Sequence, residues 1–85
     1  MEIILSPKAL EDLNLWKKSG NTGILKKIRA LLESIDESPF EGIGQPEALK
    51  YNLKGLWSRR INKEHRMIYE VRGTELEIFS LFGHY

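Results

Sequence analysis

The segment Leu56–Phe82, LWSRRINKEHRMIYEVRGTELEIFSLF, decides the fold of this chain. Apolar and polar residues alternate along it with a period of two, which is typical of half-buried β-strands. Two short polar separators, Lys63-Glu64 and Gly73-Thr74, divide the segment into three runs. Separators this short join neighbouring antiparallel strands, so the segment predicts three strands in an antiparallel sheet.

Two further strands are predicted outside this segment. The run EIIL (2–5) is short, apolar and rich in β-branched residues, and the run ALKYNL (48–53) shows the period of two before the separator Lys54-Gly55. Side chains of this kind fit the half-buried surface of a sheet. Between the two runs, ESPFEGIGQPE (37–47) contains two prolines and two glycines, which exclude regular structure.

Two amphipathic helices are predicted between residues 6 and 36. Ser6 is an N-cap and Pro7 occupies the first helical position of a helix that we expect to run to Lys18. The segment SGNTG (19–23) ends it. The second helix carries a single apolar stripe, made of Ile24, Ile28, Leu31, Leu32 and Ile35. The short loop between the helices predicts a helical hairpin.

The predicted fold is therefore α+β with the element order β-α-α-β-β-β-β, and residues 1–85 are expected to form a single domain. One mostly antiparallel sheet carries the helical hairpin on one face. This arrangement leaves the other face of the sheet open to solvent. The side chains on that open face are the candidates for function.

Composition excludes several classes of protein. The chain has 85 residues, 41% hydrophobic and 29% charged, as in ordinary soluble domains. It has no cysteine, which excludes disulfides and thiolate metal sites, and only two histidines, so no metal or cofactor is expected. No apolar stretch approaches the ~20 residues of a membrane span, and the N-terminus does not resemble a secretion signal. We expect a cytoplasmic protein.

Positive charge is concentrated in one part of the chain. The net charge is only +1, but residues 47–72 contain seven cationic and three acidic side chains. A basic patch of this kind suggests a polyanion such as nucleic acid as the partner. Imbalances of this size also occur in domains that bind no polyanion, so charge alone leaves both interpretations open.

Strand alternation brings two arginines together on the open face. Met67 suits the core, which turns its neighbour Arg66 outward, and Ile61 likewise turns Arg60 outward. The two arginines can share a face only if the connection contains a three-residue turn or a bulge around Asn62–Glu64, which we therefore predict. Paired arginines repel each other unless an anion such as a phosphate lies between them, but two solvated surface arginines remain the alternative.

Glu47, Arg60, Arg66 and His84 are predicted to converge on this open face. A carboxylate, an imidazole and guanidinium groups suit metal-free cleavage of RNA. Glu47, if it is partly buried beside the apolar loop, would take the proton of a ribose 2′-hydroxyl, whose oxygen attacks the adjacent phosphorus. His84 would protonate the leaving 5′-oxygen. DNA lacks the 2′-hydroxyl and could not react.

Each candidate also has an ordinary structural explanation. A glutamate at a strand start is usually a solvated charge, and a histidine at a C-terminus is most often disordered. Tyr51 and Tyr69 are most simply half-buried residues of the sheet, and Trp57 is more simply a packing residue than a surface for base stacking. His65, beside a turn, is more simply a hydrogen-bonding residue than a catalyst.

A longer pattern is more specific than any single residue. The stretch SPFEGIGQPEALKYNLKGLWSRRINKEHRMIYEV (38–71), followed by the terminal HY, resembles the YoeB group of the RelE superfamily. These proteins are the toxins of bacterial toxin–antitoxin pairs. The resemblance implies a microbial-RNase-like fold and an endoribonuclease that cuts mRNA in the ribosomal A site. It also implies neutralisation by a YefM-type antitoxin, a homodimer, and operator DNA bound only through the antitoxin complex.

The resemblance also assigns roles to individual residues by position. Glu47 becomes the general base, Arg66 the phosphate-stabilising arginine and His84 the general acid. Arg60 and Lys50 become substrate-binding residues, and Tyr85 the terminal aromatic residue that stacks on a base. One departure is Gln45, where a lysine is usual, and it removes a charge from the RNA-facing loop.

Two alternative functions are weighed against the ribonuclease. The first is a non-enzymatic toxin of the same fold, like the ParE group that poisons gyrase. Such a toxin would not need a glutamate, an arginine and a terminal histidine at these positions, and this chain has all three. The second is a plain RNA- or protein-binding module, which catalytically inactive variants that still bind ribosomes would separate from the enzyme.

Overall fold

The computed structural model describes residues 1–83 of the chain, and these residues form five strands and two α-helices. The elements in chain order are β1 (Glu2–Leu5), α1 (Pro7–Ser19), α2 (Thr22–Glu37), β2 (Glu47–Ala48), the 3-10 helix η1 (Tyr51–Leu53), β3 (Trp57–Arg60), β4 (Arg66–Arg72) and β5 (Glu75–Ser80). His84 and Tyr85 lie outside the described residues. The predicted α+β class and the order β-α-α-β-β-β-β are confirmed.

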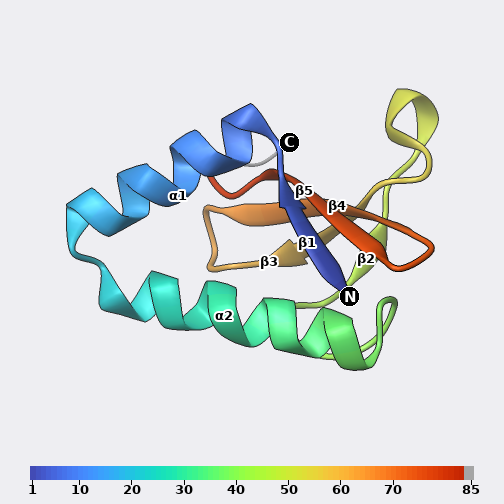
Figure 1. Ribbon diagram of the computed structural model, residues 1–85, viewed down its shortest axis with the longest axis horizontal. Helices are drawn as coiled ribbons and strands as arrows, with labels where there is room; N and C mark the ends of the chain where they lie inside the picture. The colour runs from blue at the N-terminus through green and yellow to red at the C-terminus, as the bar shows by residue number, and fades with distance from the viewer. Residues whose placement is uncertain (84–85) are drawn as a thin grey trace.

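The five strands form one sheet with the order β1-β5-β4-β3-β2 (Figure 1). Strands β2 to β5 pair antiparallel with their neighbours, as the short separators predict. Strand β1 is the exception, because it lies parallel to β5 with Leu5 opposite Ile78. The first strand of the chain therefore pairs with the last. Parallel strands need a long connection, and the two helices are part of it.

Both helices lie close to the expected bounds, although α1 extends one residue past Lys18 and α2 begins at Thr22, within the segment 19–23 that was expected to separate them. The Ser6 hydroxyl accepts the Ala9 backbone N–H at 3.1 Å, which caps α1, and Pro7 occupies its first position. Gly20, with φ +72°, ends α1 in the left-handed conformation that glycine adopts without strain. The Asn21 side chain then accepts the Ile24 N–H at 3.1 Å and starts α2. Figure 1 shows the two helices joined at one end and diverging along the sheet.

The core lies between the helices and one face of the sheet. The apolar stripe of α2 supplies Ile28 and Leu31, which pack in one buried cluster with Met67, Tyr69 and residues of β5. Burial of this apolar surface is the main source of stability, at about 25 cal/mol per Å². The prediction that the helical hairpin covers a single face is confirmed, and the opposite face carries the site described below.

The predicted strand ALKYNL (48–53) is largely wrong. Only Glu47 and Ala48 pair with β3, and the chain then turns through η1. The Leu49 N–H donates to the Leu56 carbonyl at 2.9 Å, so the residues between them form a loop that closes on itself. Tyr51 has φ +60°, a left-handed conformation that no regular strand contains.

Neither helix in the described part of the chain is both long enough and apolar enough to cross a membrane.

Candidate active site

Arg60 and Arg66 occupy directly opposite positions on β3 and β4. The connection between them is the predicted three-residue turn, Asn62–Glu64, since the Ile61 N–H donates to the His65 carbonyl at 2.9 Å. The Asn62 side chain stabilises this turn by accepting the backbone N–H groups of residues 64 and 65, each at 2.8 Å. The turn prediction made from strand alternation is therefore confirmed, and both arginines share one face.

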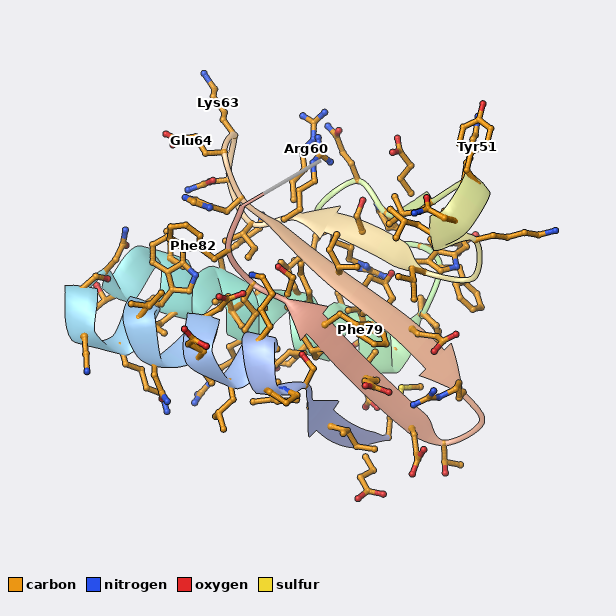
Figure 2. All side chains as sticks on the ribbon, turned by 90° about the horizontal axis from the view of Figure 1, so that it is seen from above. Tyr51, Arg60, Lys63, Glu64, Phe79 and Phe82 are labelled. Carbon is orange, nitrogen blue, oxygen red and sulfur yellow. The ribbon has the colours of Figure 1, made fainter. Side chains whose placement is uncertain are left out.

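That face is the one opposite the helices. In Figure 2 the strands lie in front of α2, and Arg60, Lys63 and Tyr51 project toward the same side of the molecule. Arg60 is exposed and Arg66 is half-buried. Neither forms an ion pair within residues 1–83. Two unpaired guanidinium groups on adjacent strands attract an anion, and their planar forks suit the oxygens of a phosphate.

Glu47 joins the same face from the neighbouring strand. It lies opposite Ser58 on β3, two residues before Arg60, and residues two apart on a strand point to the same side. The expectation that Glu47 is partly buried is wrong, because its side chain is exposed. Ser58 is only 1% exposed, and its hydroxyl has no hydrogen-bond partner among the described residues. A buried hydroxyl without a partner among the described residues therefore occupies the strand position opposite Glu47.

Lys50 and Tyr51 follow Glu47 where the chain enters η1. Both are exposed, and Tyr51 is 90% exposed. The half-buried position expected for Tyr51 is therefore wrong, and so is that expected for Tyr69, which is fully buried. The exposed Tyr51 ring therefore offers a solvent-accessible face, and the adjacent Lys50 adds a positive charge. Lys50, Tyr51 and Glu47 thus reach solvent from one short segment.

The loop that leads to Glu47 is held by a buried arginine that sequence reasoning missed. Arg59 is completely buried, and its guanidinium group makes five hydrogen bonds. Its partners are the Tyr69 hydroxyl (3.1 Å), the Ser34 hydroxyl (2.7 Å) and the carbonyls of Ser38 (2.8 Å), Glu41 (2.7 Å) and Ile43 (3.1 Å). All five N–H donors of the side chain are satisfied, so the buried charge is stabilised by carbonyl and hydroxyl dipoles.

Tyr69 completes this network beneath the loop. Its hydroxyl donates to the Pro39 carbonyl at 2.9 Å and accepts from Arg59 Nε. Burial raises the pKa of Tyr69, and the nearby Arg59 charge acts in the opposite direction. The Gly/Pro-rich segment is therefore fixed against the core by two side chains, although it contains no regular structure.

The backbone immediately before Glu47 is strained. Gly44 has φ +82°, and a Cβ there would lie 2.7 Å from a methyl group of Leu31, so only glycine fits. Gln45 also has a positive φ, +52°, which is uncommon for a residue with a side chain. The Arg60 N–H donates to the Gly44 carbonyl at 2.6 Å and ties the loop to β3. The position of Glu47 is thus fixed relative to Arg60 through the backbone.

His84 and Tyr85 were predicted to complete the site, and both lie outside the described residues. The Arg66 backbone N–H donates to the Gly83 carbonyl at 2.9 Å, so the residue before His84 lies directly against β4. The structure therefore brings Glu47, Arg60 and Arg66 onto one face and places Gly83, the last described residue, against the backbone of Arg66.

A second basic surface was also missed. Residues 13–32 contain five cationic and no acidic side chains: Lys17, Lys18, Lys26, Lys27 and Arg29. They lie at the end of α1 and the start of α2, which the short loop joins. Lys27 lines a surface hollow together with Arg60 and Lys63, whereas Lys17 and Arg29 line a different hollow, so this basic surface adjoins the arginine pair through Lys27. A net charge taken over half of the chain averages these cations with acidic residues elsewhere. A net charge taken over a window of about 20 residues would have revealed them.

Known proteins are similar to this chain in sequence and in fold. The chain is 48% identical over 71 residues to the toxin YoeB of Synechocystis, covering 84% of this chain and 83% of that protein. It superposes on the structure of a YoeB dimer from Staphylococcus aureus with a TM-score of 0.93, 45% identity and coverage of 100% and 98% of the two chains. A YoeB–YefM complex from the same organism gives a TM-score of 0.91, 46% identity and the same coverage.

The fold and these similarities define a toxin of a bacterial toxin–antitoxin system. The family model for the YoeB-like toxin of bacterial type II toxin–antitoxin systems matches residues 5–85, nearly the whole chain. The chain belongs to the YoeB toxin family.

Proposed function

We propose that this toxin is an endoribonuclease that cleaves mRNA in the ribosomal A site and thereby stops translation. The observation that carries the proposal is the Arg60–Arg66 pair on the open face, with Glu47 on the adjoining strand. Like charges placed at opposite sheet positions are destabilising unless an anion joins them. A phosphodiester is an anion whose oxygens suit two guanidinium groups. Glu47 could act as a base toward it from β2, the strand next to Arg60.

The reaction uses four side chains. The Glu47 carboxylate takes the proton from a ribose 2′-hydroxyl, and that oxygen forms a bond to the adjacent phosphorus. Arg66 and Arg60 stabilise the extra negative charge on the pentacoordinate phosphorus. The bond from phosphorus to the 5′-oxygen breaks, and His84 gives this oxygen its proton. The products are a 2′,3′-cyclic phosphate and a free 5′-hydroxyl, and this mechanism uses no metal ion.

Two exposed groups near Glu47 extend substrate binding beyond the reacting phosphate. Lys50 provides a positive charge for a neighbouring phosphate, and Tyr51 a ring face for an unpaired base. Tyr85, the last residue, provides a second aromatic ring. Stacking on aromatic rings tolerates every base, which suits an enzyme that meets many codons.

The basic surface of residues 17–29 supports ribosome binding. Phosphate backbones attract clustered lysines and arginines without regard to sequence. Because Lys27, Arg60 and Lys63 line one hollow, RNA bound on the helical hairpin would continue toward the arginine pair. We infer that ribosomal RNA occupies the hairpin surface while mRNA occupies the open face.

A YefM-type antitoxin is the proposed inhibitor. The related S. aureus toxin forms a complex with YefM, and a structure of its dimer is known. An acidic antitoxin segment that folds onto the open face would neutralise Arg60 and Arg66. We propose the same pairing here, a homodimer of the free toxin, and operator DNA bound only through the antitoxin.

Primer extension on an mRNA in a reconstituted bacterial translation reaction tests the enzyme. Wild type is compared with Glu47→Gln and His84→Ala, with and without ribosomes, and Glu11→Gln on α1 is the matched control for loss of an exposed carboxylate. We expect a new 5′ end inside the A-site codon, only with ribosomes, weakened by the first two variants and unchanged by the third. An active wild type with equally active Glu47→Gln would contradict the assigned base. Absence of cleavage by folded protein would favour a ParE-like toxin or a binding module.

A further inference from the structure

The last described residues of the chain are held by several side-chain hydrogen bonds. Asp12, only 5% exposed, accepts the Leu81 N–H at 2.9 Å, and Trp16 Nε1 donates to the Leu81 carbonyl at 2.8 Å. Lys8 donates to Asp12 at 2.7 Å and to the Ser80 hydroxyl at 3.2 Å. Three residues of α1 thus fix the chain where it leaves β5.

His65 makes the next contact along the chain. Its Nδ1 accepts the Gly83 backbone N–H at 2.9 Å. The ring is held by two aromatic neighbours, because its centroid lies 4.9 Å from that of Trp16, edge to face, and 4.5 Å from that of Phe82. An acceptor at Nδ1 requires this nitrogen to carry no proton, so the neutral ring is protonated at Nε2.

Gly83 is therefore fixed at both of its peptide groups. Its N–H donates to the His65 side chain, and its carbonyl accepts the backbone N–H of Arg66, the residue that follows His65. Gly83 has φ +88°, so the chain changes direction here in a conformation that residues with side chains rarely adopt. These two contacts therefore fix the residue that directly precedes His84 in the sequence.

We propose that His65 is a positioning residue of the cleavage reaction, which acts on the general acid His84 by holding Gly83. The inference rests on the proposed ribonuclease function. His65 and Arg66 are adjacent in the chain, so one short segment carries the phosphate-binding guanidinium group and also fixes the residue before the acid. Small displacements of a catalytic group are costly, since a shift of about 1 Å can lower a rate about 100-fold.

Two substitutions separate the hydrogen bond from the packing. His65→Phe keeps an aromatic ring between Trp16 and Phe82 but removes the acceptor. His65→Asn removes the ring but places Oδ1 where Nδ1 was, at the same number of bonds from the backbone, and so keeps an acceptor. A purely structural role predicts that the phenylalanine variant is the more active of the two, and a positioning role predicts the opposite.

The measurement is single-turnover cleavage on ribosomes with an mRNA codon in the A site, as a function of toxin concentration. For His65→Phe we expect a maximal rate lower by about tenfold or more and a half-saturating concentration within about threefold of wild type. For His65→Asn we expect the rate to recover to within about threefold. Hydrogen exchange of the Gly83 amide, measured on the same proteins, should accelerate only in the phenylalanine variant.

The outcomes distinguish the two proposals. An active wild type with an equally active, folded His65→Phe would overturn the role of His65 and leave the ribonuclease standing. The role of His65 would also be overturned if His65→Asn cleaved as slowly as His65→Phe while the Gly83 amide of the asparagine variant stayed protected from exchange. A wild type that leaves mRNA intact would overturn the ribonuclease, and with it a positioning role in that reaction.

Discussion

Arg60 and Arg66 form a directly opposed like-charge pair on adjacent antiparallel strands, on the sheet face opposite α1 and α2. Like charges at such positions destabilise a sheet by a few tenths of a kcal/mol to about 1 kcal/mol. The arrangement therefore costs free energy in the free protein, and a bound anion would offset that cost. A toxin that is held by an antitoxin until it acts can tolerate this cost.

Removing one charge of the arginine pair should stabilise the folded protein. We expect Arg60→Gln to raise the free energy of unfolding by about 0.2–1 kcal/mol at low salt, because the repulsion is lost. Mobile ions screen charges about 10 Å apart at 0.1 M salt, so the gain should shrink as salt is added. Urea unfolding at two salt concentrations measures it, with Lys63→Gln in the adjoining turn as the control. A loss of stability at low salt would show that the pair does not repel.

Arg59 should be essential for stability, unlike its neighbour Arg60. Lysine has three donors on a single nitrogen and cannot reach the five acceptors that Arg59 bonds, so Arg59→Lys leaves buried carbonyls unsatisfied. We expect a loss of about 2–4 kcal/mol in the free energy of unfolding. Chemical denaturation of Arg59→Lys and Arg60→Lys gives the comparison, and equal stability of the two variants would contradict the role assigned to Arg59.

Gly44 should tolerate no side chain. Gly44→Ala combines a positive φ with a Cβ 2.7 Å from Leu31, whereas Gly20→Ala has a similar φ but no atom within 4 Å. Gly20→Ala reports the backbone strain alone, which should lower the free energy of unfolding by about 1–2 kcal/mol. Gly44→Ala should lower it by at least about 1 kcal/mol more. Thermal unfolding of both proteins tests this. Similar melting temperatures would mean that Leu31 moves aside easily.

Tyr51 should contribute to substrate binding and hardly to stability. Its side chain is 90% exposed, so Tyr51→Ala removes almost no buried surface. If the ring stacks on a base, its loss should weaken RNA binding by about 1–3 kcal/mol, and Tyr51→Trp should retain the affinity. Binding of catalytically inactive Glu47→Gln protein to mRNA-programmed ribosomes, with and without Tyr51→Ala, measures the effect. Unchanged affinity would remove Tyr51 from the substrate site.

The parts of the fold that followed from sequence are those with repeated local signals. The two helices have caps at Ser6 and Asn21 together with long apolar stripes, and the last two strands have six residues or more of alternation. The Arg60–Arg66 pairing followed because a period of two leaves few possible registers. Each of these features is encoded within a short stretch of chain.

The features that sequence reasoning missed depend on contacts between distant residues. Arg59 bonds carbonyls about 20 residues earlier, and His65 bonds Gly83, 18 residues later. No local pattern marks either contact. The error at ALKYNL has a related cause, since six residues of alternating character also suit a loop whose leucines turn back onto the sheet. The burial expected at Glu47 failed because the loop packs through Arg59 beneath it and leaves the carboxylate in solvent.

The most direct test of the central claim replaces the nucleophile itself. An mRNA is prepared with one 2′-deoxynucleotide at the position in the A-site codon where primer extension first maps the cut, and the all-ribose mRNA of the same sequence is the control. Attack by the 2′-oxygen, with Glu47 as base and Arg60 and Arg66 on the phosphate, predicts that cleavage at this position disappears and that toxin binding to the ribosome persists. Cleavage of the deoxy-substituted mRNA at the same position and rate would contradict the mechanism.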